Sequence, residues 1–352
     1  MGDQRTAKHL DWIDWTRAVC CVAVVYLHTW SSSTIPLDDQ AVAKVGFARL
    51  VSIEVLQTVL TRFAVPIFFM ITGYLLLARE KEVGLDRVKR YALRMVAILA
   101  TLGYATCLQR AWKAGFTTMP DLALRALLYL YIGNSWRFLW YVYALLGIYL
   151  VMPLLKVFAS HAEKSTYLFV LGVLFCLTLV APTIENLTGM TLSKLFPLNG
   201  SSSLFYVMLG GYVRIFDVRL TRRLAVVSVA GVLASIAGQV MLMRLTGGDG
   251  VAFRKPECPL LMPYALLAFL LMRRAFERRP GVPRVVKSLS ANTFAIYLVH
   301  PVLIHLLYFE VHVNPRKLPV GGGLVVCLGL LAVAWALASL LRRVPGVRNV
   351  LS

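Results

Sequence analysis

Residues 13–30 read IDWTRAVCCVAVVYLHTW, an apolar stretch with an arginine, Arg17, near its start and a histidine, His28, near its end. A stretch of this length can cross the roughly 30 Å of hydrocarbon in a bilayer as an α-helix. Ionisable side chains are costly there and usually face the interior of a helix bundle or a watery cavity. The stretch therefore predicts a membrane-spanning helix in which two residues need polar surroundings.

The composition of the whole chain is that of an integral membrane protein. Of its 352 residues, 59% are hydrophobic and 15% are charged, whereas soluble domains average about half and about a quarter. Apolar runs recur from end to end, so we predict one polytopic domain over residues 1–352, with the lipid bilayer as its surroundings. The formal net charge of +20 comes from Lys and Arg in short loops between these runs, which argues against a nucleic-acid partner.

The apolar runs predict an all-α, polytopic bundle of about ten transmembrane helices. A β-barrel would instead show short strands of alternating hydrophobicity. The segment 121–133 is too short to span comfortably and predicts a surface or re-entrant helix. The predicted spans are residues 13–30, 55–78, 91–110, 138–156, 165–182, 203–216, 223–243, 259–273, 292–310 and 322–341.

Basic segments indicate the orientation of the bundle. Residues 79–90, 214–223, 273–287 and 342–348 are rich in Lys and Arg and fall on alternate connections, on the side of the basic N-terminus. Cytoplasmic loops of membrane proteins carry such an excess. We therefore expect both termini in the cytoplasm.

Arg17 and His28 are eleven residues apart, which sets their relative positions on the first helix. At 100° per residue, eleven steps come within about 20° of three full turns, so both side chains lie on one face about 16 Å apart. Asp14 and Cys21 fall on nearly the same stripe. Either the stripe lines a path inward from the cytoplasm, or Arg17 snorkels to the headgroups and His28 is structural.

The second predicted span carries three further features, within and just before FAVPIFFMITGYLLL (residues 63–77). Pro66 removes a backbone donor, so the helix can bend there. Gly73 lets a neighbouring backbone approach closely. Arg62 lies inside the span and needs a partner or a polar ligand.

Arg87, Lys89, Arg90 and Arg94 stand at the mouth of the third predicted span. The positive-inside rule explains such a cluster without any site. Alternatively, the arginines form a forked clamp for the phosphates of an anionic cofactor.

Two later stretches have open interpretations. The aromatic-rich residues 138–155, FLWYVYALLGIYLVMPLL, are typical of an interfacial belt. In the ninth span His300 directly precedes Pro301, and His305 follows. A helix interrupted at this proline can expose carbonyls to a cavity, but the proline can equally be only a kink.

The six cysteines lack CxxC pairs and Cys/His ligand spacing, so we expect small core residues and no metal site. The chain also lacks GxSxG, HExxH, P-loop and dinucleotide-binding motifs. The chemistry available therefore comes from histidines and arginines within a membrane.

Four stretches in order resemble the acyltransferase 3 family of membrane acyltransferases, and most closely its stand-alone bacterial O-acetyltransferases. They are IDWTRAVCCVAVVYLHTW with an Arg, ten residues, His pattern; FAVPIFFMITGYLLL, with Thr72 where the family usually has serine; LWYVYALLGIYLVMPLL; and NTFAIYLVHPVLI. The similarity covers nearly the whole chain.

The resemblance implies acyl-coenzyme A, usually acetyl-CoA, as cytoplasmic donor and a hydroxyl of a glycan or lipid-linked sugar as acceptor. His28 would be the general base, because a neutral histidine suits that role near pH 7. Arg17 would be its arginine partner, holding coenzyme phosphate or stabilising the oxyanion. The family's arginine pair after the second span matches two of Arg87, Arg90 and Arg94, and the spacing does not decide which.

Together with Arg62, those three arginines are the candidate coenzyme contacts. The resemblance also implies the bacterial inner membrane. Many relatives carry a C-terminal esterase-like domain, which we do not expect here because the chain stops just after its last span. The alternatives are a transporter or flippase with a path along Arg17, Arg62 and His28, and a scaffold in which charged residues only pair helices. The oligomeric state stays open.

Overall fold

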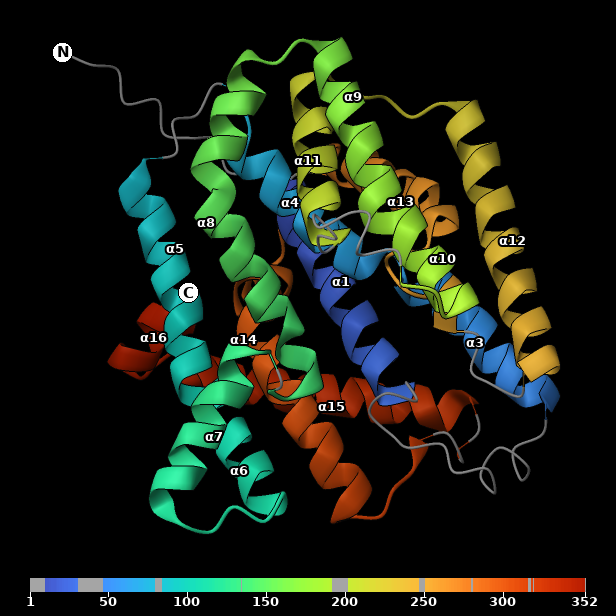
Figure 1. The fold of residues 1–352 in the computed structure, drawn as a ribbon. Coiled ribbons are helices and arrows are strands. Elements are labelled where there is room, and N and C mark those ends of the chain that lie inside the picture. The colour runs from blue at the N-terminus through green and yellow to red at the C-terminus, as the bar shows by residue number, and fades with distance from the viewer. Residues whose placement is uncertain are drawn as a thin grey trace.

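The computed structural model describes residues 10–30, 47–79, 84–133, 135–191, 202–246, 251–279, 281–315, 318 and 320–351. These residues form helices and their connections, which confirms the predicted all-α, polytopic membrane fold (Figure 1). The helices that follow the predicted spans are α1 (Asp11–Trp30), α3 (Phe47–Thr61) with α4 (Ala64–Leu76), α5 (Leu85–Ile98) with η1 (Leu99–Gly103) and α6 (Tyr104–Lys113), α8 (Trp140–His161), α9 (Lys164–Phe175) with η3 (Cys176–Val180) and α10 (Ala181–Thr188), α11 (Ser202–Ile215), α12 (Arg222–Thr246), α13 (Met262–Glu277), α14 (Arg284–Phe309) and α15 (Val320–Leu341).

Eight helical stretches of the described chain are long and apolar enough to cross a membrane. They match eight of the ten predicted spans, and α1 and α11 follow the other two. These two helices are largely enclosed by protein: 13 of the 20 residues of α1 are buried, and 10 of the 14 residues of α11. Helix α11 has only 14 residues, which is short for a span. Helix α1 carries Asp14, Arg17 and His28, and a helix surrounded by other helices can carry polar groups that lipid would not tolerate.

The second predicted span is broken in two. Helix α3 ends at Thr61 and α4 begins at Ala64, so Arg62 and Phe63 lie at the break. Pro66 explains its position, because a proline ring clashes with the carbonyl four residues earlier, here that of Arg62. The predicted bend is confirmed, and it places a basic residue where the helix is interrupted.

Helices α4 and α11 cross in direct backbone contact. A Cβ atom added at Gly73 would lie 1.8 Å from the Val207 carbonyl oxygen, and one at Gly210 would lie 2.0 Å from that of Met70. No side chain fits at either position, so the two glycines set the distance between these helices. The close approach expected at Gly73 is confirmed.

Helix α1 runs through the middle of the bundle and packs against α4, α13 and α14 (Figure 1). It is parallel to α14, since Ser290 Oγ donates to Asp14 Oδ1 over 2.6 Å and His28 contacts His300 further along both helices. Helix α14 continues unbroken through Pro301, which rules out an interruption, one of the two interpretations left open for this proline.

Helices α5 and α12 lie on opposite sides of the bundle in Figure 1.

Helix α7 (Met119–Tyr131) packs against α6, and Ala126 is its one buried residue. It lies where a surface or re-entrant helix is expected, over 121–133. The short helix α16 (Pro345–Leu351) packs against α5 and α14 at the C-terminus.

Five of the six cysteines are buried, as expected for core residues, but Cys176 is exposed. The prediction was wrong at that position because it took every apolar segment as core. In a membrane protein, apolar residues also cover the surface that faces lipid. Cys176 begins η3, a single π-helical stretch between α9 and α10.

Candidate active site

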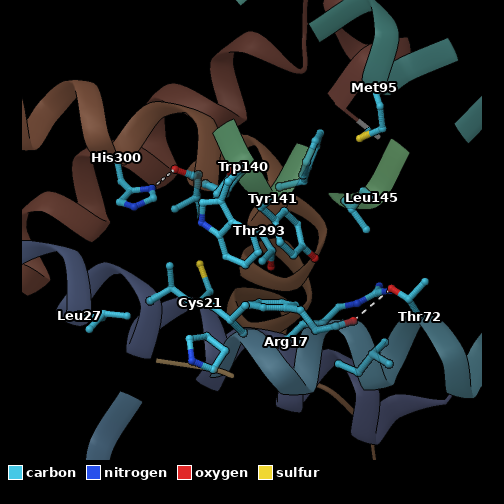
Figure 2. Close-up of a pocket in the computed structure, with 18 of the residues that line it drawn as sticks. Arg17, Cys21, Leu27, Thr72, Met95, Trp140, Tyr141, Leu145, Thr293 and His300 are labelled. Carbon is cyan, nitrogen blue, oxygen red and sulfur yellow. Dashed lines mark hydrogen bonds between the residues drawn. The ribbon is translucent and has the colours of Figure 1, made fainter. Parts of the chain in front are cut away.

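A cavity of about 980 Å³ lies within the helix bundle, beside α1. This volume is at the upper end of the about 300–1,000 Å³ typical of small-molecule sites. Most of its wall comes from α1, α4, α8 and α14. Figure 2 shows Arg17, Cys21 and Leu27 of α1 on one side, with Trp140, Tyr141, Thr293 and His300 across from them.

The cavity wall reaches residues near both ends of the bundle. At one end it includes Tyr91, Arg94 and Arg342, which we call the arginine mouth. At the other it includes Asn186, Ser202, Lys255 and Glu257, which we call the loop mouth. Helix α1 begins on the side of the arginine mouth and ends toward the loop mouth. Arg17 therefore lies nearer the arginine mouth, and His28 lies nearer the loop mouth.

The predicted stripe on α1 lies on this wall. Arg17, Cys21 and His28 all line the cavity. Asp14, the fourth residue of the stripe, is buried behind it and accepts the hydrogen bond from Ser290. The stripe thus lies on the wall of a cavity, as the lined-path interpretation requires.

His28 forms a pair with a second histidine. Its Nδ1 lies 2.6 Å from Nε2 of His300, and Nδ1 of His300 lies 2.9 Å from the Ile296 carbonyl oxygen. The two rings are nearly parallel, with an interplanar angle of 2°. Both histidines line the cavity; His300 is fully buried, and His28 is partly exposed.

Two of the predicted arginines act near these groups. Arg62, at the break between α3 and α4, lines the cavity and interacts electrostatically with His28. Arg17 lines it closer to the arginine mouth and interacts with Tyr141 and Tyr149. The cavity wall therefore carries two cationic side chains, Arg17 toward the arginine mouth and Arg62 near His28.

The three arginines at the start of the third span separate into two groups. Arg94 lines the cavity, and its guanidinium lies 5.7 Å from the centre of the Tyr91 ring. Arg87 and Arg90 are exposed and are not on the cavity wall. The sequence spacing of these three arginines does not distinguish them, but the fold does.

Polar contacts hold the loop mouth together. Lys255 Nζ donates to Asn186 Oδ1 over 2.8 Å, and Ser202 Oγ donates to Glu257 Oε1 over 3.4 Å. The Tyr206 hydroxyl donates to the Pro256 carbonyl oxygen over 2.9 Å. Sequence reasoning missed this cluster because its members come from α10, α11 and the connection before α13, which no local pattern joins.

Other wall residues were seen in the sequence but interpreted differently. Trp140, Tyr141 and Tyr149 line the cavity, although an interfacial belt accounted for them in sequence. His300 stood out beside Pro301 without an assigned role. Arg342 belonged to a basic tail that topology alone explained; its Nη1 donates to the Ala291 carbonyl oxygen over 2.8 Å beside the cavity.

Comparison with known proteins identifies the chain's relatives. A family model described as "Acyltransferase domain" matches residues 10–339. The chain is 23% identical over 341 residues to "Putative membrane-bound acyltransferase YfiQ" of Bacillus subtilis, covering 91% of this chain and 89% of that protein. It is 25% identical over 322 residues to "Amino-acid racemase" of Enterococcus faecalis, covering 84% of this chain and 41% of that longer protein. No solved structure matches the chain.

The matched region runs from α1 to near the end of α15 and includes Arg17, His28 and His300. It accounts for nearly the whole chain, and the resemblance seen in the four sequence blocks is confirmed. This protein is a multi-pass membrane protein of the acyltransferase 3 family.

Proposed function

We propose that this protein is an O-acetyltransferase of the bacterial inner membrane. It moves an acetyl group from cytoplasmic acetyl-CoA to a hydroxyl of a glycan or lipid-linked sugar. The observation that carries the proposal is a single cavity that holds His28 between an arginine mouth and a polar loop mouth. Such a cavity suits two substrates that arrive from opposite sides.

His28 is the general base of the proposed reaction. It removes the proton of the acceptor hydroxyl while the hydroxyl oxygen attacks the thioester carbonyl carbon. The tetrahedral intermediate collapses, the carbon–sulfur bond breaks, and the proton leaves on the coenzyme thiol. The cationic side chains of Arg17 and Arg62, on the same wall, can stabilise the negative oxygen of that intermediate.

The arginine mouth receives the donor. Arg94 and Arg342 line it, and guanidinium groups bind phosphates through paired hydrogen bonds. The positive-inside pattern predicts that this mouth faces the cytoplasm, where acetyl-CoA is made. Arg87 and Arg90 lie outside the cavity, and topology alone accounts for them.

The loop mouth receives the acceptor. Lysine, glutamate, asparagine and serine side chains there offer both donors and acceptors of hydrogen bonds, which suits a polyhydroxylated sugar. In the proposed orientation this mouth faces away from the cytoplasm. The acetyl group therefore moves from the arginine mouth along α1 into the membrane, where it meets the acceptor at His28.

The experiment compares three forms of the protein in a bacterial host that lacks it: wild type, His28→Ala and His161→Ala. His161 is exposed at the end of α8, outside the cavity, and serves as the matched control. We expect wild type and His161→Ala to add the mass of one acetyl group to a glycan or membrane lipid, as seen by mass spectrometry. His28→Ala should add none.

An equal mass gain in His28→Ala would contradict the proposed mechanism. Movement of a lipid-linked sugar across reconstituted vesicles without acetyl-CoA would instead support the transporter hypothesis. Binding of acetyl-CoA to the purified protein, measured by calorimetry, provides the independent check on the donor.

A further inference from the structure

The contact between His28 and His300 is a hydrogen bond in the plane of the two rings. Rings stacked face to face would keep their atoms more than 3 Å apart at van der Waals distance, but here two nitrogens lie 2.6 Å from one another. The planes differ by 2° and the ring centres lie 4.9 Å apart. That separation matches two rings joined edge to edge, with the nitrogen lone pair of one aimed at the N–H of the other.

The Ile296 carbonyl decides which nitrogen of each ring carries a proton. A carbonyl oxygen only accepts, so Nδ1 of His300, 2.9 Å away, must be the donor. In a neutral imidazole the other nitrogen is then an acceptor, so Nε2 of His300 accepts from Nδ1–H of His28. The remaining nitrogen of His28, Nε2, is left with its lone pair free.

We infer that His300 is a positioning residue that fixes His28 in the tautomer with a proton on Nδ1, so that Nε2 is the basic nitrogen offered to the acceptor hydroxyl. The chain of bonds from the Ile296 carbonyl through His300 to His28 supplies no charge. It works through orientation, because His300 is fully buried and held by its own helix. This inference rests on the proposed function of His28 as the base.

The same chain also suits the protonated form of His28. After Nε2 takes the hydroxyl proton, both nitrogens of His28 are donors, and Nδ1–H still points at the lone pair of His300. The bond to a charged donor is stronger than the neutral one, so the imidazolium is stabilised without a buried carboxylate. The proton on Nε2 then passes to the departing sulfur, and the pair returns to its first state.

The direct test measures the tautomer and requires no turnover. Protein labelled with ¹⁵N at histidine is reconstituted in lipid at mildly alkaline pH, and the His28 signals are assigned by their absence in His28→Gln. We expect wild-type His28 to show a protonated Nδ1 and an unprotonated Nε2. In His300→Leu we expect a shift toward the Nε2–H form that free histidine favours.

Activity measurements separate orientation from packing. His300→Leu removes the acceptor and should lower kcat by about 10²–10⁴-fold, the range that general-base catalysis contributes, with the KM for acetyl-CoA unchanged. His300→Gln keeps an acceptor oxygen near the position of Nε2 and should recover a large part of that loss. His305→Leu, in the same helix but off the cavity wall, is the matched control and should keep wild-type kcat.

Three results would each overturn the inference. They are a wild-type His28 protonated on Nε2, a His28 tautomer that is the same in His300→Leu, and a loss of kcat in His300→Gln equal to that in His300→Leu. Because the spectra need no substrate, these outcomes are distinct from failure of the proposed function, which would appear as absent acetyl transfer by wild type.

Discussion

Arg94 and Arg87 lie two turns apart on α5, yet only Arg94 reaches the cavity. If the arginine mouth binds the coenzyme phosphates, Arg94→Gln should weaken acetyl-CoA binding about tenfold or more, since a hydrogen bond to a charged group contributes roughly 1.5–3 kcal/mol. Arg87→Gln should bind as wild type does. Isothermal titration calorimetry in detergent measures both dissociation constants.

Arg90→Gln is the second control for this comparison, because Arg90 is exposed one turn before Arg94. Equal weakening in all three variants would mean that net basic charge, and not the cavity wall, attracts the coenzyme. Unchanged binding in Arg94→Gln would remove the arginine mouth from the proposal.

At the residue scale, the sequence predicted which residues share a face of one helix but missed a contact between residues of two helices. Helical periodicity brought Arg17 and His28 to one face, and both line the cavity. His300 lies 272 positions from His28, and no periodicity spans such a separation. The pair follows from α1 and α14 being parallel neighbours, which is a property of packing.

At the scale of elements, the crossing of α4 and α11 requires glycine at positions 73 and 210, because no Cβ atom fits there. Gly73→Ala and Gly210→Ala each place a methyl group against a carbonyl oxygen, so the helices must separate. We expect each to lower stability by about 1–3 kcal/mol, as overpacking does in well-packed cores. The temperature at which the detergent-solubilised protein loses its monodisperse elution profile measures the effect.

Gly172→Ala is the matched control for this prediction. Gly172 is also a helical glycine, in α9, but a Cβ atom there has nothing within 4 Å. Alanine is the better helix former, so this variant should be as stable as wild type or slightly more stable. Equal loss in Gly172→Ala and Gly73→Ala would show that the backbone contact is not the cause.

The sequence predicted the helical elements well but not their irregularities. Hydropathy located the spans because each must be apolar over a bilayer's thickness, whatever it packs against. It missed the π-helical turns η1 and η3. It also made two spans too short: the third, predicted over 91–110, is helical over 85–113, and the fifth, predicted over 165–182, is helical over 164–188. The break at Arg62 was predictable because its cause is local: the ring of Pro66 clashes with the carbonyl four residues earlier.

At the scale of the whole molecule, the cavity acquires a direction only when the bundle is oriented in the membrane. Arg17 and Arg94 lie toward one end of the cavity, and Lys255 and Glu257 line the other. Hydropathy could not predict this cavity, because residues that are far apart in the sequence, from Arg17 to Val350, form its wall. The charge pattern of the loops could predict its direction, because orientation depends on the sum of many Lys and Arg residues.

That direction can be tested by labelling single cysteines from one side. In a Cys176→Ser background, which removes the one exposed cysteine of the described chain, Asn186→Cys marks the loop mouth and Arg90→Cys marks the arginine side; both positions are exposed. If the N-terminal side is cytoplasmic, a membrane-impermeant maleimide added to spheroplasts should label Asn186→Cys and spare Arg90→Cys. Inside-out vesicles should give the reverse, and the Cys176→Ser parent should stay unlabelled in both. Labelling of Arg90→Cys from outside would show that the bundle has the opposite orientation. The arginine mouth would then face away from cytoplasmic acetyl-CoA, and the proposed direction of acetyl transfer would be wrong.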